Sequence, residues 1–396
     1  MKVRVGLIGA GFSASIHASA YAVVRVVDVE IAAVAALPLE SAQAFARTHG
    51  IASAYDDYRR LLERDDIDVV DICAPNTLHA PFAIAAAEAG KHIICEKPLT
   101  GYFGGKGAAD PVGATPKELM LEEAIRSSDQ MISAAKNAGV KLMYAENWIY
   151  APPVQKAMDL VDTAGGTVLE IRAEESHSGS HAAYAREWAQ AGGGALVRLG
   201  SHPIGATLYI KRREGMGRTG RAIRPVSVVA DVANLARITS FQAEGRHWIV
   251  DDWHDVENWS VLVITFEDGS RARISASDTV LGGMEDILEV YLSNGRIRCD
   301  MGHSGLVRAF APDPTVWGDA YIMEKVDHRG GWSYPSVNEH WMLGYQQEIQ
   351  DFIEAIAWDR EPLSTGNLGR DVVEVMYAAY QSAEEGRRVE LRRGNP

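Results

Sequence analysis

Short apolar runs and amphipathic segments alternate along the first third of the chain. Brief apolar runs are typical of buried parallel strands, whereas apolar positions three or four apart are typical of helices packed on a sheet. The pattern predicts strands at 3–8, 31–35, 69–72, 92–95 and 141–143, and helices at 16–24, 40–48, 55–64, 79–89 and 118–138. Alternation of this kind predicts an α/β Rossmann domain, a doubly wound parallel sheet, over residues 1–145.

Longer strands with alternating apolar and polar positions follow the first domain. They are predicted at 168–174, 226–235, 260–266, 271–277, 287–292 and 297–300, with helices at 340–359 and 367–385 and a last strand at 388–391. This indicates an α+β domain over 146–396 with a large, mostly antiparallel open sheet. Because helices on one face leave the other uncovered, we expect a homo-oligomer, a dimer or tetramer, formed through this sheet.

Composition narrows the class of protein. The chain has 396 residues, 47% of them hydrophobic, and a net charge of −14 that is spread along the sequence, which argues against nucleic-acid binding. No apolar run approaches the ~20 residues of a membrane span, and the N-terminus enters a strand without a signal peptide. We therefore expect a cytoplasmic protein with no membrane partner, and three reduced cysteines rather than a metal site or disulfide.

A glycine-rich turn joins the first strand to the first helix. It reads Gly9-Ala10-Gly11-Phe12-Ser13-Ala14, a Gly-x-Gly-x-x-Ala pattern that lets the backbone and the helix N-terminus approach a pyrophosphate. The second strand usually ends in an acidic residue for the ribose or a basic one for a 2′-phosphate, but residues 36–38 read Ala-Leu-Pro. We favour NAD as the cofactor and keep NADP open.

The stretch KHIICEKPLT, residues 91–100, places Lys97 directly after a predicted strand. Ligands of open α/β sheets bind outside the carboxyl ends of the strands, so Lys97 is expected at the active crevice. The glycine- and proline-rich insertion at 101–116 follows at once. It could be a lid, a contact between subunits or a decoration of the surface.

Four ordered motifs give the chain a resemblance to the Gfo/Idh/MocA oxidoreductases from end to end. They are the glycine turn, the APNTLH segment at 74–79, the EKP segment at 96–98, and three glycines at 192–194 followed by GSH at 200–202. The resemblance implies that Lys97 bonds the reacting oxygen and that His202 is the acid–base residue. It also implies a set of cofactor-binding residues, namely Gly9, Gly11, Phe12, Ala14, Ala36, Pro75, Asn76, His79, Glu96, Lys97 and Asn147.

Elementary chemistry supports the two catalytic candidates. Removal of a hydride from a secondary alcohol needs a group that takes the hydroxyl proton, and an imidazole suits this task near neutral pH. An ammonium group stabilises the negative charge that develops on the oxygen. Candidate substrate contacts are Lys97, Tyr150, His181, Arg198, Ser201 and His202, with His181 favoured over His177 in a polar loop.

One position departs from the family pattern. Arg198 stands where the family has an aspartate four residues before the histidine, and the next acidic position, three after it, is Gly205. Arg198 could bind an anionic substrate, turn to a structural partner such as Glu174 or Glu175, or mark a loss of dehydrogenase chemistry. The sequence thus indicates an NAD(P)-dependent dehydrogenase acting on a sugar, glycoside or cyclitol. The alternatives are an NAD-dependent glycosidase or lyase and a non-catalytic dinucleotide-binding protein.

Overall fold

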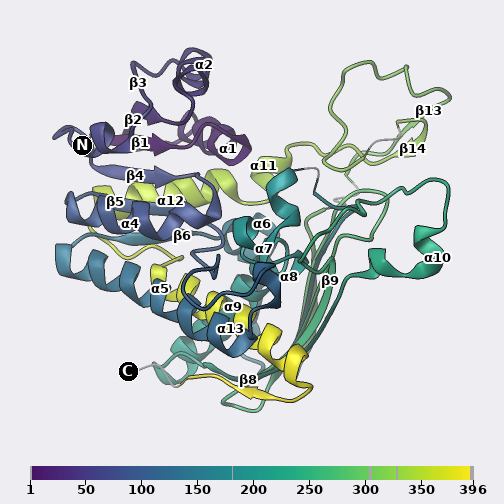
Figure 1. Cartoon of the computed structure of the whole chain (residues 1–396). Coiled ribbons are helices and arrows are strands. Elements are labelled where there is room, and N and C mark those ends of the chain that lie inside the picture. The colour runs from purple at the N-terminus through teal and green to yellow at the C-terminus, as the bar shows by residue number, and fades with distance from the viewer. Residues whose placement is uncertain (1, 181, 303–305, 327–328, 393–396) are drawn as a thin grey trace.

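A parallel sheet is formed by the first third of the chain in the computed structural model, which describes residues 2–180, 182–302, 306–326 and 329–392 (Figure 1). Its strand order is β3-β2-β1-β4-β5-β6 and all pairs are parallel. The strands are β1 (Lys2–Ile8), β2 (Asp28–Ala35), β3 (Ser53–Tyr55), β4 (Val69–Ile72), β5 (His92–Glu96) and β6 (Leu142–Ala145). The helices between them are α1 (Phe12–Tyr21), α2 (Leu39–His49), α3 (Tyr58–Leu62), α4 (His79–Glu88) and α5 (Lys117–Ala138). The predicted doubly wound sheet is confirmed.

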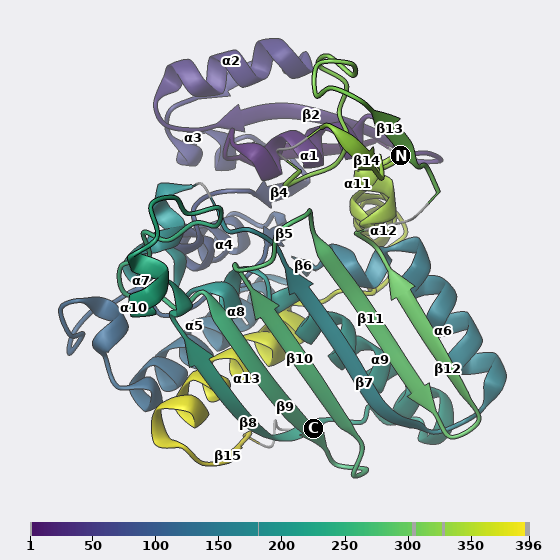
Figure 2. The same ribbon diagram turned by 90° about the vertical axis from the view of Figure 1, so that its right-hand side faces the viewer.

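The second sheet has seven strands in the order β12-β11-β7-β10-β9-β8-β15. They are β7 (Val168–Ser176), β8 (Pro225–Ala233), β9 (Trp259–Phe266), β10 (Arg271–Ser277), β11 (Glu285–Leu292), β12 (Gly295–Asp300) and β15 (Val389–Glu390). Only the pairing of β10 with β7 is parallel. Figure 2 shows this sheet with its helices behind one face and the other face open, as the sequence predicts.

Helices α6 (Pro152–Ala164), α9 (Ser201–Thr219) and α13 (Gly366–Glu385) lie behind the second sheet (Figure 2). The sequence pattern gives no sign of α9, because its residues 201–211 are all buried and no polar stripe marks a solvent face. Among the described residues, no helix is long and apolar enough to cross a membrane.

The predicted helix at 340–359 is two helices, α11 (Glu339–Met342) and α12 (Tyr345–Ala357), separated by Gly344 at a φ of +92°. A Cβ at Gly344 would lie 2.3 Å from the carbonyl oxygen of Asn147, so only glycine fits this break. Helix α12 packs against α1 and β1 of the first sheet. Likewise the helix predicted at 55–64 begins only at residue 58, because Ser53–Tyr55 pairs with β2 as β3.

The insertion at 101–116 is anchored on the second half of the chain. The backbone N–H of Tyr102 donates to the hydroxyl of Tyr377 at 2.7 Å, and its carbonyl accepts from the indole of Trp188 at 3.1 Å. The backbone N–H of Gly113 donates to Asp255 at 2.8 Å. These bonds make the segment a brace between the two halves of the chain rather than a free lid.

Candidate active site

The glycine turn has the geometry of a phosphate cradle. Gly9 has a φ of +117°, and a Cβ there would lie 2.2 Å from the carbonyl oxygen of Cys73. Gly11 precedes α1, no side chain caps this helix end, and among the described residues no heavy atom lies within 4 Å of a Cβ built at Gly11. The backbone N–H groups at the start of α1 are therefore open to an anion. Ala14 is fully buried and packs the helix on the sheet behind the turn.

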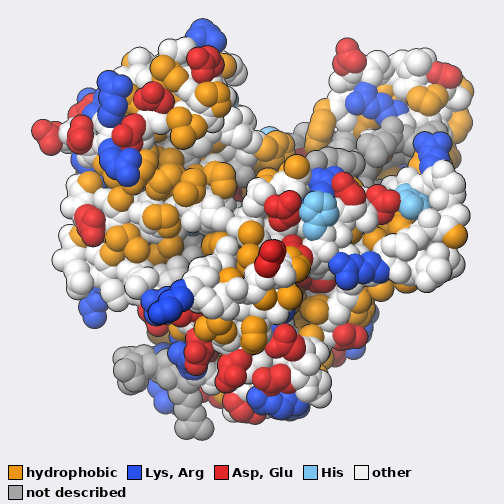
Figure 3. All heavy atoms as spheres, viewed as in Figure 1, with side chains coloured by type: hydrophobic (Ala, Val, Ile, Leu, Met, Phe, Trp, Pro, Cys, Tyr) orange, Lys and Arg blue, Asp and Glu red, His pale blue; other side chains and the backbone are white. Residues whose placement is uncertain are grey.

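A cavity of about 550 Å³ lies beside this turn. Phe12 and Ile16 of α1 line it, together with Glu324, Lys325 and Tyr345. Figure 3 shows a hollow between the two upper lobes of the molecule. In Figure 1 these lobes are the α1–α2 end of the first sheet and the segment with β13 (Ala309–Ala311) and β14 (Gly331–Ser333). The open helix end and the adjoining cavity fit the phosphates of a dinucleotide.

The remaining cofactor candidates hold the loops around the crevice together. The amide of Asn76 donates to the carbonyl of Ala191 at 2.9 Å, and that of Asn147 to the carbonyl of Leu343 at 2.8 Å. Both ring nitrogens of the buried His79 lie within 3.0 Å of backbone carbonyls, one of which follows β4 and the other β5. Pro75 precedes this helix start, and Ala36 follows β2. Their contacts with a cofactor stay a prediction.

Lys97 follows β5, and its side chain crosses to the second half of the molecule. Its ammonium donates to the backbone carbonyl of Arg198 at 2.9 Å. Glu96, which is buried, accepts from the backbone N–H of Lys97 at 2.9 Å and lies 3.2 Å from Nε2 of His17. Lys97 is partly buried, and its bond to the carbonyl of Arg198 holds the ammonium near the end of β5.

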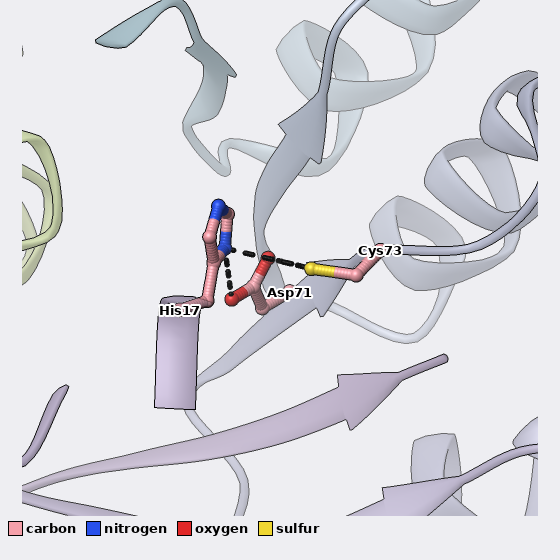
Figure 4. A group of neighbouring side chains, drawn as sticks. All are labelled: His17, Asp71 and Cys73. Atoms are coloured by element: carbon pink, nitrogen blue, oxygen red, sulfur yellow. Dashed lines mark hydrogen bonds and ion pairs between the residues drawn. The ribbon is translucent and has the colours of Figure 1, made fainter. Parts of the chain in front are cut away.

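Beneath the turn, His17, Asp71 and Cys73 form a buried group (Figure 4). Nδ1 of His17 lies 2.9 Å from Asp71, whose carboxylate also accepts from the hydroxyl of Tyr21. Burial lowers the pKa of His17, but Asp71 outweighs this and the net shift is well upward. The three side chains are close enough to hold a metal ion. Because they already bond to one another and to Glu96, we interpret them as a charge network that links α1 to Lys97.

His202 lies in the first turn of α9 and faces Lys97. Its Nδ1 is 2.7 Å from Oε1 of Glu146, and its ring stacks on that of Trp148 with centroids 5.9 Å apart and 13° between planes. Burial and the charge of Lys97 lower the pKa of His202 well below its usual value. The imidazole is therefore neutral at physiological pH and held in one orientation.

The side chain of Arg198 is paired within the protein. Its guanidinium forms a buried ion pair with Asp278, which follows β10, and lies 4.9 Å from the ring centroid of Trp253. Of the three interpretations of this position, the geometry favours the structural one, although the partner is Asp278 rather than Glu174 or Glu175. Its carbonyl, rather than its charge, contacts the active site.

Replacing Arg198 with alanine is expected to lower the free energy of unfolding by about 3–5 kcal/mol, because Asp278 would stay buried without its partner. Arg213→Ala, which breaks the exposed pair with Asp162 at 2.7 Å, is the matched control and should cost about 1 kcal/mol or less. Urea denaturation of both variants measures the difference. Equal losses would contradict a structural role for Arg198.

Three further substrate candidates fall differently. Tyr150 is 2% exposed, and its hydroxyl donates to Asp351 at 2.8 Å and accepts from the backbone N–H of Ser364, so the hydroxyl is bonded within the protein. Its ring packs edge-on against Phe352 of α12, and its contact with a substrate stays a prediction. Ser201 is fully buried beside His202. His181 lies outside the described residues.

Glu257 fixes the glycine-rich turn that leads to Arg198. Its carboxylate accepts from the backbone N–H groups of Gly194 and Leu196 and from the hydroxyl of Tyr380, at 3.1, 2.9 and 2.8 Å. A Cβ at Gly194 would lie 1.8 Å from the carbonyl oxygen of Glu257, so glycine is required there. Burial raises the pKa of Glu257 to about 7.

This shift predicts a pH-dependent stability. A glutamate of ordinary pKa ionises more readily in the unfolded chain, so ionising Glu257 in the folded protein costs about 3 kcal/mol. The folded protein has its full stability when Glu257 is protonated, below the pKa of the unfolded chain. This stability is lost as the pH rises through about 7. Between roughly pH 5 and 8, the wild-type free energy of unfolding should fall by about that amount relative to Glu257→Gln. Parallel curves from urea denaturation would contradict the prediction.

The sequence misses several residues of this site. Glu146 follows β6, where the rule that ligands bind at carboxyl strand ends could have pointed to it. Asp71 lies within an apolar strand and His17 one helical turn beyond the glycine motif, and a buried polar residue in such places is a signal in itself. Asp278 carries no local signal, because only the fold brings it to Arg198.

Comparison with known proteins shows what the chain is similar to. The chain is 33% identical over 53% of its length to levoglucosan dehydrogenase of Pseudarthrobacter phenanthrenivorans, of which it covers 51%. It is 24% identical to myo-inositol 2-dehydrogenase of Thermotoga maritima, with 98% of each chain covered. The crystal structure of GenD2 from gentamicin A biosynthesis, in complex with NAD, has the same fold, with a TM-score of 0.78 at 24% identity over 99% of this chain and 97% of that chain.

Family models match both halves of the chain. The model of the oxidoreductase family with an NAD-binding Rossmann fold matches residues 3–105. The model of the family's C-terminal α/β domain matches residues 164–391, more than half of the sequence. The chain therefore belongs to the Gfo/Idh/MocA family of NAD-binding oxidoreductases.

Proposed function

We propose that the protein is an NAD(P)-dependent dehydrogenase that transfers a hydride between the nicotinamide and a secondary hydroxyl or keto group of a neutral sugar, glycoside or cyclitol. The observation that carries the proposal is the bond of the Lys97 ammonium to the carbonyl of Arg198 at 2.9 Å, four residues before His202. Lys97 and His202 come from the end of β5 and the start of α9, and the charge of Lys97 acts directly on the pKa of His202. An ammonium beside a neutral imidazole is the pair that alcohol oxidation needs.

Each of these residues has a defined task. NAD, when bound, supplies the acceptor for the hydride. In the oxidative direction Nε2 of His202 takes the hydroxyl proton, since Nδ1 is engaged by Glu146. Lys97 donates a hydrogen bond to the same substrate oxygen and stabilises the negative charge that develops on it. The carbonyl of Arg198 holds the ammonium in place.

The charges around Lys97 support a substrate without negative charge. Glu96, Glu175 and Glu324 all interact electrostatically with Lys97. Glu146 adds a fourth carboxyl group, while the charge of Arg198 is already neutralised by Asp278. An anionic substrate would have to share the charge of Lys97 with these carboxyl groups. Two relatives are named for levoglucosan and for inositol, which are neutral polyols.

A paired substrate panel tests the proposal. Neutral sugars, glycosides and inositols are each compared with a uronate or phosphate analogue, with NAD and with NADP, by the absorbance of the reduced cofactor. NADP is included because residues 36–38 carry neither an acidic nor a basic side chain. Turnover of neutral members is expected. Turnover confined to anionic members would contradict the substrate class, and no cofactor reduction with any member would contradict the dehydrogenase assignment.

The two alternatives are not favoured. A glycosidase or lyase that oxidises its substrate transiently would release product without net NADH, and a non-catalytic protein would bind NAD alone. The curated relatives carry the names of dehydrogenases. Net accumulation of NADH in the panel separates the dehydrogenase from both alternatives.

We further propose that the open face of the second sheet joins subunits into a dimer or tetramer. Val229 and Val263, on neighbouring strands, pair directly across this face, and each is about two-fifths exposed. Exposed apolar side chains in register suit a self-complementary interface. Light scattering should give an oligomer for the wild type and a smaller species for Val263→Glu; a monomeric wild type would contradict the proposal.

A further inference from the structure

The carboxylate that contacts His202 comes from an unexpected place. The family resemblance predicts acidic residues four before and three after this histidine, where the chain has Arg198 and Gly205. Instead Glu146, one residue after β6, brings Oε1 to 2.7 Å from Nδ1 of His202. We propose that Glu146 is the positioning residue of His202, in place of the carboxylate that positions 198 and 205 lack. This inference rests on the proposed function, in which His202 is the base.

Gly205 is what makes room for Glu146. It lies one turn after His202 on α9, and a Cβ built there would be 2.8 Å from Cγ and 2.9 Å from Oε2 of Glu146. Any side chain at this position would push the glutamate off the imidazole. Glycine inside a helix is unfavourable, so its presence in the buried part of α9 indicates a specific need for the space. The glycine at 205 and the glutamate at 146 therefore belong together, because the first leaves the space that the second occupies.

Glu146 has few partners. Its side chain is fully buried, and its second oxygen, Oε2, has no hydrogen-bond partner among the described residues. The carboxyl group bonds to His202 and to the backbone of Trp148. A buried carboxylate with so few partners is costly, so its bond to His202 helps to account for its presence. Among the described residues, Glu146 makes no hydrogen bond to Lys97 or Arg198. Its electrostatic neighbours are Lys97, Glu96, Glu175, Glu348 and Tyr144.

The contact determines which nitrogen of His202 reacts. When Glu146 is ionised, its carboxylate accepts from Nδ1–H, which leaves Nε2 with a free lone pair. Burial raises the pKa of Glu146, so the tautomer of His202 is the property that the test below measures. In the oxidative direction the hydroxyl proton moves to Nε2 as the hydride leaves the carbon for the cofactor, and Glu146 stabilises the imidazolium that results. Trp148 holds the plane of the ring, and Glu146 its rotation. Glu146 therefore acts through His202 and does not touch the substrate.

A carboxylate swap tests this role. Glu146→Ala is expected to lower kcat about 10²-fold with little change in KM, and the double variant E146A/G205D should recover at least about tenfold of that loss. The built Cβ at 205 points at the site that the removed glutamate vacates, so an aspartate there can reach Nδ1. Glu374→Ala, which removes a buried glutamate on α13, is the matched control and should keep kcat. A swap that recovers nothing would overturn the inference.

A second variant and a second readout keep the test independent of turnover and of folding. Glu146→Gln preserves the volume of the side chain and should also lower kcat about tenfold or more, because an amide cannot stabilise imidazolium. Nitrogen NMR of histidine-labelled protein, with the His202 signal identified through His202→Gln, reports the tautomer directly. We expect Nδ1–H in the wild type and in E146A/G205D, and its loss in E146A; an unchanged tautomer in E146A would overturn the inference. If the wild type reduces no cofactor with any substrate, the proposed function fails while the NMR result still decides the role of Glu146.

Discussion

Replacing Lys97 with methionine is expected to lower kcat by about 10²–10³-fold while the affinity for NAD changes only a few fold. Methionine keeps most of the apolar stem and removes the ammonium, so the side chain can still fill its place between β5 and Arg198. The substrate oxygen would then gain negative charge among Glu96, Glu175 and Glu324 without a cation beside it. The rate of NADH formation with the best substrate of the panel measures kcat, and quenching of protein fluorescence measures cofactor affinity.

Lys106→Met is the control for this prediction, because Lys106 is exposed within the 101–116 insertion. It should match the wild type in both measurements. An active Lys97→Met enzyme would remove Lys97 from the chemistry. A loss that appears only in cofactor affinity would move its role from the reaction to NAD binding, near the network of Glu96 and His17.

Short motifs at chain positions fixed by the fold class are what the sequence predicts well. The glycine turn, Lys97 and His202 are recognisable because each lies where a strand or helix begins or ends, and the parallel sheet brings such ends to one edge. The alternation of apolar and polar residues also predicts both sheets and the face that stays open. In these cases local pattern and global fold carry the same information.

The sequence does not predict which side chains far apart in the chain contact one another. Arg198 meets Asp278 because α8 (Ala195–Arg198) packs beside β10, and Tyr150 is drawn to Asp351 because the broken helix lets α12 return to the first sheet. In both cases a polar residue near the crevice bonds to a carboxylate far along the chain. The same reasoning explains Glu146, whose role depends on a glycine on α9. Such pairings require the packing of elements that sequence patterns do not order in space.

Replacing His202 with glutamine is expected to lower kcat for oxidation by about 10²–10⁴-fold and to change the shape of its pH profile. The base must be unprotonated to take the hydroxyl proton. Burial and Lys97 lower the pKa of His202, so the wild-type rate should be flat through neutral pH and should fall only at pH values below the usual pKa of histidine. In the variant this acid limb should disappear along with most of the rate.

His247→Gln provides the matched control, since His247 also bonds to a carboxylate, Asp251, but lies in the loop after α10 (Thr239–Gln242). That bond raises the pKa of His247, whereas burial and Lys97 lower the pKa of His202. The profile of His247→Gln should therefore coincide with that of the wild type. If His202→Gln instead kept the wild-type acid limb, the base would be another group, and Glu146 would be the first to consider, because its pKa is raised by burial and it already lies against the imidazole.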